Sequence, residues 1–254
     1  MCQARVGGQY KVPHTWQVEA PLAEYYGVAW YRRTFDVRPD WQNSTVRVEF
    51  EAVFHTATVW INGQLAGEHR GKGYTAFTFD VTHLLHWGEA NAIAVRVDNA
   101  FNEHMLPRGR SSDWAHDGGI FRPVQLLISP KVFVERVDVQ ATPNFTDGDA
   151  TIAITGYIRN TSHRDWSGGT SFRIVDEASG LTVLKRDRGQ VSRLSPEQPK
   201  RWRWRLLCLK QSCGTSIIPT CIGFASRSRG QIHPTAFLRS LASAGWRSKM
   251  ARSI

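Results

Sequence analysis

The sequence TVWINGQLAG, residues 58–67, decides the fold of this chain. It consists of two short runs suited to β-strands that flank Asn62-Gly63, a dipeptide that readily adopts the positive φ angles of a two-residue hairpin turn. Apolar and polar residues alternate in VRVEF (46–50) and IAVRV (93–97), with the two-residue period of a half-buried strand. Residues 74–81 and 121–128 also read as strands. Several short strands without long helical patterns predict an antiparallel β-sandwich.

A second set of predicted strands follows Pro130. Turn-forming residues separate its members, which cover residues 132–134, 137–139, 150–154, 171–175, 181–184 and 202–205. We therefore expect an all-β chain with one sandwich domain over residues 1–129 and a second over residues 130–206. The second domain is expected to stop before its last strands.

Four sequence blocks occur in series: VPHTW (12–16), WYRRTF (30–35), ATVWING (57–63) and GGIFR (118–122). Together and in this order they resemble the N-terminal sugar-binding sandwich of glycoside hydrolase family 2, the family of β-galactosidases, β-glucuronidases and β-mannosidases. The resemblance covers about residues 12–206. It implies a galactose-binding-like jelly-roll sandwich followed by an incomplete immunoglobulin-like β-sandwich.

The positive charge of the chain is concentrated at its end. The formal net charge is +10, but residues 207–254 hold seven Lys and Arg and no Asp or Glu. Without them, 25 basic residues face 22 acidic ones, so the body of the chain is nearly neutral. A nucleic-acid-binding protein would depend entirely on this segment, and no basic groove with stacking side chains supports that alternative. We expect neither a nucleic-acid nor a membrane partner.

The cysteines are Cys2, Cys208, Cys213 and Cys221, a distribution that fits neither a disulfide framework nor a zinc site. We expect no metal and no cofactor. Residues 1–10 contain no apolar signal-peptide core, so a cytoplasmic location is the default expectation. No apolar run approaches the roughly 20 residues that a transmembrane helix requires.

Residues 207–254 read as a disordered tail produced by a shifted reading frame. A set of codons compatible with residues 213–224, read from the third base, gives Trp-Asp-Ile-Asp-His-Pro-Tyr-Leu-Tyr-Arg-Leu. This resembles a Leu-Trp…Pro-Tyr-Leu-Tyr element near the end of the second sandwich of the family. Residues 240–246, shifted in the same direction, can read Phe-Gly-Phe-Arg-Trp-Met-Glu, like the segment that leads into the family's barrel. A true disordered tail is the alternative.

The resemblance implies a retaining glycosidase whose two catalytic glutamates lie on a (β/α)₈ barrel. Such a barrel takes about 250 residues. We therefore name no catalytic residue among these 254 and expect the chain to be inactive alone. The resemblance also implies a carbohydrate, a β-glycoside, as the partner, and homo-oligomers among full-length relatives.

One carboxylate is a candidate sugar ligand. The family pattern places an aspartate nine residues before the Arg of the GGIFR block, and here this residue is Asp113. A carboxylate accepts hydrogen bonds from two sugar hydroxyls with one rigid group, although an Asp after Ser-Ser also caps local backbone amides. Trp114 and His116 are weaker candidates, for stacking on a sugar ring and for hydrogen bonding.

Two functions of different classes remain open from the sequence. The first is the N-terminal, non-catalytic part of a retaining β-glycosidase, with the β-galactosidase type favoured, acting on terminal β-linked sugars. The alternative is a free-standing carbohydrate-binding protein made of sandwich domains.

Overall fold

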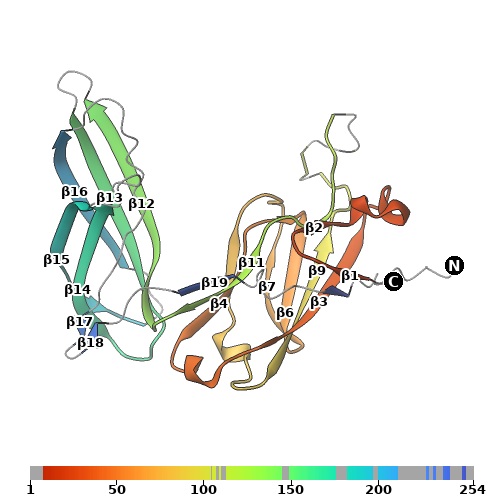
Figure 1. Ribbon diagram of the computed structural model, residues 1–254, viewed down its shortest axis with the longest axis horizontal. Helices are drawn as coiled ribbons and strands as arrows, with labels where there is room; N and C mark the ends of the chain where they lie inside the picture. Colours follow the sequence, from red (N-terminus) through yellow and green to blue (C-terminus); the bar gives the residue numbers. More distant parts are fainter. Residues whose placement is uncertain are drawn as a thin grey trace. The chain divides into compact units, whose positions relative to one another are not determined.

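The computed structural model describes residues 8–103, 105–106, 109, 113–144, 149–175, 182–196, 200–210, 227–228, 231–232, 237–240 and 248–249. These residues form an all-β protein, as the alternating pattern predicted (Figure 1). The described helices are three-residue 3-10 turns, η1 (Trp16–Val18), η2 (Ala20–Leu22), η3 (Pro39–Trp41) and η4 (Thr82–Leu84). None of them has the length to cross a membrane.

The chain divides into two compact units. Unit 1 is Met1–Ile128 with Phe237–Ile254, and unit 2 is Ser129–Ala236. The strands of unit 1 are β1 (Gln9–Tyr10), β2 (His14–Thr15), β3 (Val28–Asp36), β4 (Thr45–Phe50), β5 (Val53–Phe54), β6 (Thr56–Ile61), β7 (Gln64–His69), β8 (Phe77–Asp80), β9 (Ala90–Asp98), β10 (Gly119–Ile120), β11 (Val124–Ser129), β19 (Phe237–Ser240) and β20 (Ser248–Lys249). β11 ends one residue into unit 2.

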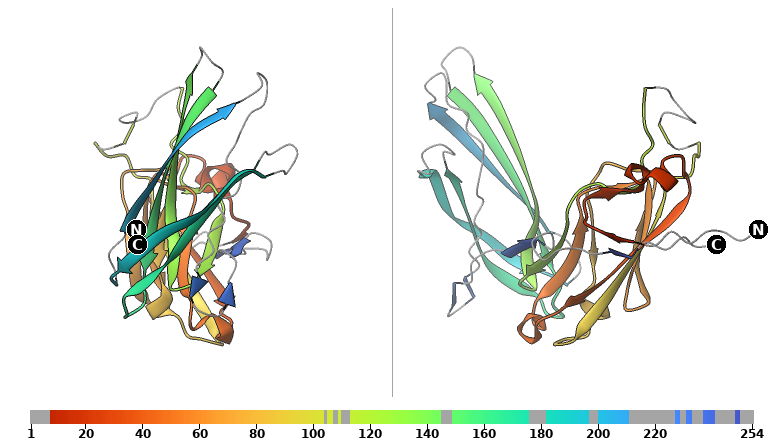
Figure 2. Two further views of the ribbon diagram at one scale, coloured as in Figure 1. Left: turned by 90° about the vertical axis from the view of Figure 1, so that its left-hand side faces the viewer. Right: turned by 45° about the vertical axis from the view of Figure 1, so that its right-hand side comes forward.

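Unit 1 is a sandwich of jelly-roll type. One sheet has the strand order β3-β9-β6-β7 and the facing sheet the order β19-β11-β4-β8, while β2-β10-β5 form a short third sheet. Figure 2 shows the ribbon of unit 1 from two further sides, with its strands coloured along the sequence. Alternate residues of both large sheets meet in one hydrophobic core, among them Tyr31, Val48, Val59, Val95 and Leu126. The two-residue side-chain period of a strand is what turns these residues inward together.

The hairpin of residues 58–67 forms as predicted. Ile61 pairs with Gln64, so Asn62 and Gly63 are the two turn residues. Their φ angles are 51° and 81°, the positive values of a type I′ turn.

Two strands differ from the sequence prediction. The strand expected over residues 74–81 is only β8, because β4 ends at Phe50, which pairs with Phe77, and so leaves Tyr74 in a loop. The strand expected over residues 121–128 begins only at Val124, as β11, and residues 121–123 connect it to β10. Pro123 lies in the break, where its missing N–H removes a ladder hydrogen bond.

Unit 2 contains two sheets of long strands. β12 (Val132–Asn144), β13 (Asp149–Asn160) and β16 (Lys200–Lys210) pair in one sheet, and β14 (Trp166–Val175) and β15 (Thr182–Leu194) pair in the other. A small core of Ile158, Val191 and Leu194 has Val132, Val134 and Trp166 packed against it. The immunoglobulin-like form of residues 130–206 stays a prediction.

The prediction of a disordered, frame-shifted segment over residues 207–254 falls mostly outside the described residues. Within this segment the structure describes the end of β16 and four short strands. These four strands are β17 (Arg227–Ser228), β18 (Gln231–Ile232), β19 and β20. β19 pairs with β11, and β20 pairs with β1.

Candidate functional site: the loop between β9 and β10

The predicted sugar ligands lie on the loop that connects β9 to β10. This loop leaves β9 after Asp98 and returns at Gly119. Asp113 and Trp114 are exposed, with 46% of the Trp114 surface accessible, whereas His116 is buried. The structure therefore brings two of the three candidates to the surface of the same loop.

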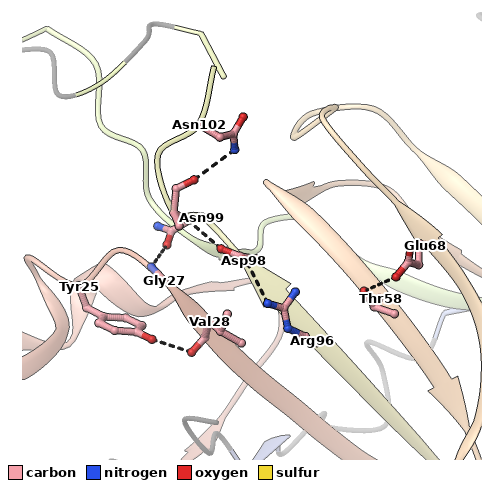
Figure 3. A network of polar contacts seen from close by, with 10 residues as sticks. Tyr25, Gly27, Val28, Thr58, Glu68, Arg96, Asp98, Asn99 and Asn102 are labelled. Atoms are coloured by element: carbon pink, nitrogen blue, oxygen red, sulfur yellow. Dashed lines mark hydrogen bonds and ion pairs between the residues drawn. The ribbon is translucent and has the colours of Figure 1, made fainter. Parts of the chain in front are cut away.

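Asn99 holds the first stem of the loop. Its side-chain oxygen accepts a hydrogen bond from the Gly27 backbone N–H at 2.9 Å (Figure 3). Its amide nitrogen donates to the His116 carbonyl at 2.8 Å. The Asn99 backbone N–H also donates to the Gly27 carbonyl at 3.1 Å. The Asn99 side chain is fully buried, so these bonds are shielded from water and fix where the loop leaves the sheet.

Gln17 and its neighbours hold the second stem. The Gly118 backbone N–H donates to Gln17 Oε1 at 2.7 Å, and the Gly118 carbonyl accepts from the Trp16 backbone N–H and from Thr15 Oγ1. Gln17 Nε2 in turn donates to the Tyr25 carbonyl at 2.9 Å. The VPHTW block that carried part of the family resemblance thus positions the returning end of the loop.

His116 packs beneath the loop. Only 1% of its surface is accessible, and its ring meets Phe101 edge-on at 5.0 Å and Phe54 at 5.9 Å between ring centroids. A ring enclosed in this way does not face solvent. Its position is that of a packing residue, so we do not carry His116 into the proposed sugar site.

Tyr74 belongs to the exposed surface beside Trp114, and sequence reasoning missed it. The two rings meet edge to face, with centroids 6.2 Å apart and an interplanar angle of 89°. Burial raises the pKa of Tyr74 and the charge of Asp117 raises it further, while a hydrogen bond with Trp114 acts in the opposite direction. The phenol therefore stays protonated at neutral pH and can both donate and accept hydrogen bonds. The signal that could have found it is the glycine-flanked loop GKGY at residues 71–74.

A carboxylate next to a half-exposed indole and a phenol can bind a polyhydroxylated ligand. Asp113 offers acceptors for vicinal hydroxyls, and the aromatic rings offer apolar surface to a sugar's C–H face. The described residues contain no cluster of three or more His, Cys, Asp or Glu side chains that could hold a metal ion.

Comparison with known families decides the relationship. Residues 8–130 match the family model described as "Glycosyl hydrolases family 2, sugar binding domain". The chain carries a glycoside hydrolase family 2 sugar-binding domain. The matched residues contain all four sequence blocks and the whole β9–β10 loop.

Curated family 2 relatives have two activities in their names. The chain is 36% identical over 131 residues to a β-glucuronidase of Bacteroides fragilis, and 37% identical over 133 residues to a β-galactosidase of Thermoanaerobacter pseudethanolicus. These alignments cover 50% and 52% of this chain and 18% of each relative. A β-galactosidase of Bacteroides ovatus is 36% identical over 213 residues, which is 75% of this chain and 24% of that protein. The chain thus spans about a fifth to a quarter of these relatives.

Solved family 2 structures share the fold. The β-glucuronidase of Bacteroides uniformis aligns with a TM-score of 0.74 at 23% identity, over 90% of this chain and 28% of that one. A family 2 member from Bacteroides cellulosilyticus aligns with a TM-score of 0.71 at 22% identity, over 91% and 32% of the two chains. The likeness covers both units of this chain and confirms the all-β fold.

Proposed function

We propose that this chain is the N-terminal, non-catalytic part of a retaining β-glycosidase that acts on terminal β-linked sugars. The single observation that carries the proposal is the exposed Asp113 and Trp114 beside Tyr74 on a loop held at both stems, within a family 2 sugar-binding domain. In this proposal Asp113 accepts hydrogen bonds from sugar hydroxyls, and a barrel outside these 254 residues supplies the two catalytic carboxylates.

Within this function we propose the β-galactosidase type. The alignment to the Bacteroides ovatus β-galactosidase supports it, because this match extends at 36% identity across 75% of the chain. The match to a β-glucuronidase is also strong, at 36% over a shorter segment. An active longer form should therefore be assayed on nitrophenyl β-galactoside and nitrophenyl β-glucuronide in parallel, and a preference for the glucuronide would overturn the galactosidase type.

Sequencing the coding DNA with its downstream region tests the larger proposal. A downstream barrel with two glutamates, in a frame continuous with residues 1–206, supports it. The 254-residue chain alone is expected to hydrolyse none of the nitrophenyl β-galactoside, β-glucuronide and β-mannoside substrates. Turnover that co-purifies with this chain through several columns would contradict its non-catalytic role.

The role of Asp113 is tested in the longer, active form. Loss of a charged hydrogen bond costs about 1.5–3 kcal/mol, so Asp113→Ala should lower kcat/KM roughly 10- to 150-fold. Asp40→Ala is the matched control, because Asp40 is also an exposed aspartate of unit 1 but lies in the 3-10 turn after β3. Equal kinetics for the two variants would show that Asp113 does not bind the sugar.

The alternative is a free-standing carbohydrate-binding protein. The observation that favours it is that unit 1 has a hydrophobic core of its own, drawn from both large sheets. It requires an intergenic region directly after the coding sequence.

A further inference from the structure

A cavity of about 280 Å³ opens on unit 1, and neither Asp113 nor Trp114 is among its lining residues. Its lining comes from β6, β7, the end of β9 and the first residues of the β9–β10 loop: Thr56, Thr58, Glu68, Arg70, Arg96, Asp98, Ala100, Phe101 and Asn102. This volume is close to the lower limit of about 300 Å³ for small-molecule sites. It suits one sugar ring better than an oligosaccharide.

Strand register places the polar groups of this cavity on one face of the sheet. Arg96 on β9 lies opposite Thr58 on β6, and Thr58 lies opposite Glu68 on β7. Asp98, two residues after Arg96, lies opposite Thr56. The alternate residues of β6 and β9, Ala57, Val59, Val95 and Val97, point into the core. The polar rows therefore occupy the outer face.

The polar groups are held in place before any ligand arrives. Arg96 Nη2 donates to Asp98 Oδ2 at 3.0 Å, and the Ala100 backbone N–H donates to Asp98 Oδ1 at 3.0 Å. Thr58 Oγ1 donates to Glu68 Oε1 at 3.3 Å, as Figure 3 shows. Each carboxylate oxygen has two lone pairs and arginine has five N–H groups, so hydrogen-bonding capacity is left for a ligand. Groups fixed in advance lose less conformational entropy on binding.

The charges in the lining cancel. Two guanidinium groups, Arg70 and Arg96, are matched by two carboxylates, Glu68 and Asp98, and each arginine is ion-paired with one of them. An anionic ligand gains no net attraction from such a set, whereas a neutral molecule with many hydroxyls can use both acceptors and donors.

Aromatic surface adjoins the polar groups. Trp30 on β3 lies directly opposite Arg96, and its ring stacks with that of Trp60 at 5.1 Å and 30°. Both indoles are half-buried on the outer face, and Phe101 lines the cavity itself. Polar groups beside apolar aromatic surface are the combination that ligand sites for amphipathic molecules use.

From this arrangement we infer that the outer face of the β3-β9-β6-β7 sheet holds a binding site for a neutral sugar. Arg96, Asp98, Thr58 and Glu68 supply its polar groups, and Phe101 and Asn102 line it from the start of the β9–β10 loop. The site is formed by side chains other than Asp113 and Trp114, and it goes beyond the function proposed above. It binds a sugar without cleaving it.

The test is a titration of the 254-residue chain with methyl β-galactopyranoside, followed by two-dimensional NMR, at concentrations up to about 50 mM, well above a dissociation constant near 1 mM. Saturable shifts of the backbone amides of Arg96–Asn102 are expected. Arg96→Gln should weaken binding at least about 10-fold, because a charged hydrogen-bond donor is lost. Absence of saturable binding by the parent chain overturns the inference.

Two more variants show whether a loss of binding is specific to the cavity. Arg38→Gln removes an arginine from an ion pair of the same i, i+2 spacing, Arg38 with Asp40, outside the cavity, and should leave the affinity unchanged. Glu68→Gln keeps the shape of the side chain and should also weaken binding, which covers the case in which Arg96→Gln fails to fold. An equal loss for Arg38→Gln, or none for both cavity variants, overturns the inference.

Two further titrations test whether the ligand is a neutral sugar and whether this site is independent of the proposed site at Asp113. Methyl β-glucuronide should bind more weakly than the galactoside, and tighter binding of the glucuronide contradicts a neutral-sugar site. Asp113→Ala should leave this binding intact. If Asp113→Ala abolishes it while Arg96→Gln does not, the sugar sits at the loop, and this inference fails while the proposed function stands.

Discussion

Asn62 Nδ2 donates a hydrogen bond to Asn91 Oδ1 at 2.7 Å, which ties the β6–β7 turn to the start of β9. Asn62 Nδ2 also donates to the Leu84 carbonyl, and Asn62 Oδ1 accepts from the Ala92 backbone N–H. Asn91 is buried and bonds the backbone of His86 and Glu89. Two asparagines thus connect three separate turns of the sandwich.

We predict that Asn62→Ala destabilises unit 1 by about 2 kcal/mol. The variant loses the three side-chain hydrogen bonds of Asn62. It also places alanine, whose side chain cannot form local hydrogen bonds, at a positive φ, and this alone costs about 1 kcal/mol. Urea unfolding followed by tryptophan fluorescence measures the change. Gln64→Ala, an exposed position on the same hairpin, is the control and should stay within about 0.5 kcal/mol of the parent. Equal effects of the two changes would show that the turn network adds nothing.

We predict that Asn99→Ala costs about 2–3 kcal/mol, because the Gly27 N–H and the His116 carbonyl lose their buried partner. The amides of residues 113–118 should also exchange hydrogen faster. Asn102→Ala, which removes an exposed bond from Asn102 Nδ2 to the Ala100 carbonyl, should change stability by no more than about 0.5 kcal/mol. Unchanged exchange in Asn99→Ala would mean that the loop does not depend on this stem.

We predict a pH-dependent contribution from His14. Its Nδ1 is hydrogen-bonded to the Tyr31 hydroxyl at 2.9 Å, its ring packs on Tyr10, and Glu19 lies 3.9 Å from Nε2. Burial lowers the pKa of His14 below its ordinary value near 6.5, although the charge of Glu19 opposes the shift. The unfolded chain therefore takes up the proton first as pH falls. The stability that neutral His14 provides is complete above about pH 6.5 and is lost as pH falls through the folded pKa.

The measurement is the urea midpoint of the parent and of His14→Gln between about pH 7.5 and pH 5. The advantage of the parent should narrow as pH falls. Gln42→Ala changes an exposed residue of the same unit that does not titrate, and should show no such trend. A gap between the parent and His14→Gln that stays constant over this range would contradict the prediction.

The pairing of β19 with β11 gives a fourth prediction. Residues 125–128 pair with residues 237–240 in antiparallel register. A chain ending at Lys210 should therefore lose hydrogen-exchange protection at alternate amides of residues 125–128, because these groups become a sheet edge. Equal protection in the shortened and full chains would contradict the pairing and agree with a disordered segment over residues 207–254.

The sequence allowed prediction of the features that depend on local pattern. The Asn62-Gly63 turn and the strands at residues 46–50 and 93–97 follow from turn chemistry and from alternation alone. The extent of β8 could not be predicted this way, because alternation continues to Tyr74 while the partner strand ends at Phe50. A strand exists only where a neighbouring backbone pairs with it.

The candidate site was predictable only in part. Asp113 came from the family pattern and Trp114 from its place beside Asp113, and the structure places both on the surface of one loop. The burial of His116 and the packing of Tyr74 on Trp114 depend on contacts between segments far apart in the chain. Nor could alternation show that polar residues on β6, β7 and β9 share one cavity, because that requires the strand order of the sheet.

Gly118 and Gly119 admit no larger residue. A Cβ on Gly118 would overlap the Trp16 ring, and Gly119, at φ 151°, lies against the His14 carbonyl. With Asn99 at the opposite stem, these glycines fix both ends of the loop, and Phe101 and His116 pack against each other beneath it. Exposed loop positions such as Leu106 and Ala115 can therefore change without disturbing the sandwich. A protein engineer could vary these positions while keeping Asn99, Phe101, His116 and Gly118-Gly119 unchanged.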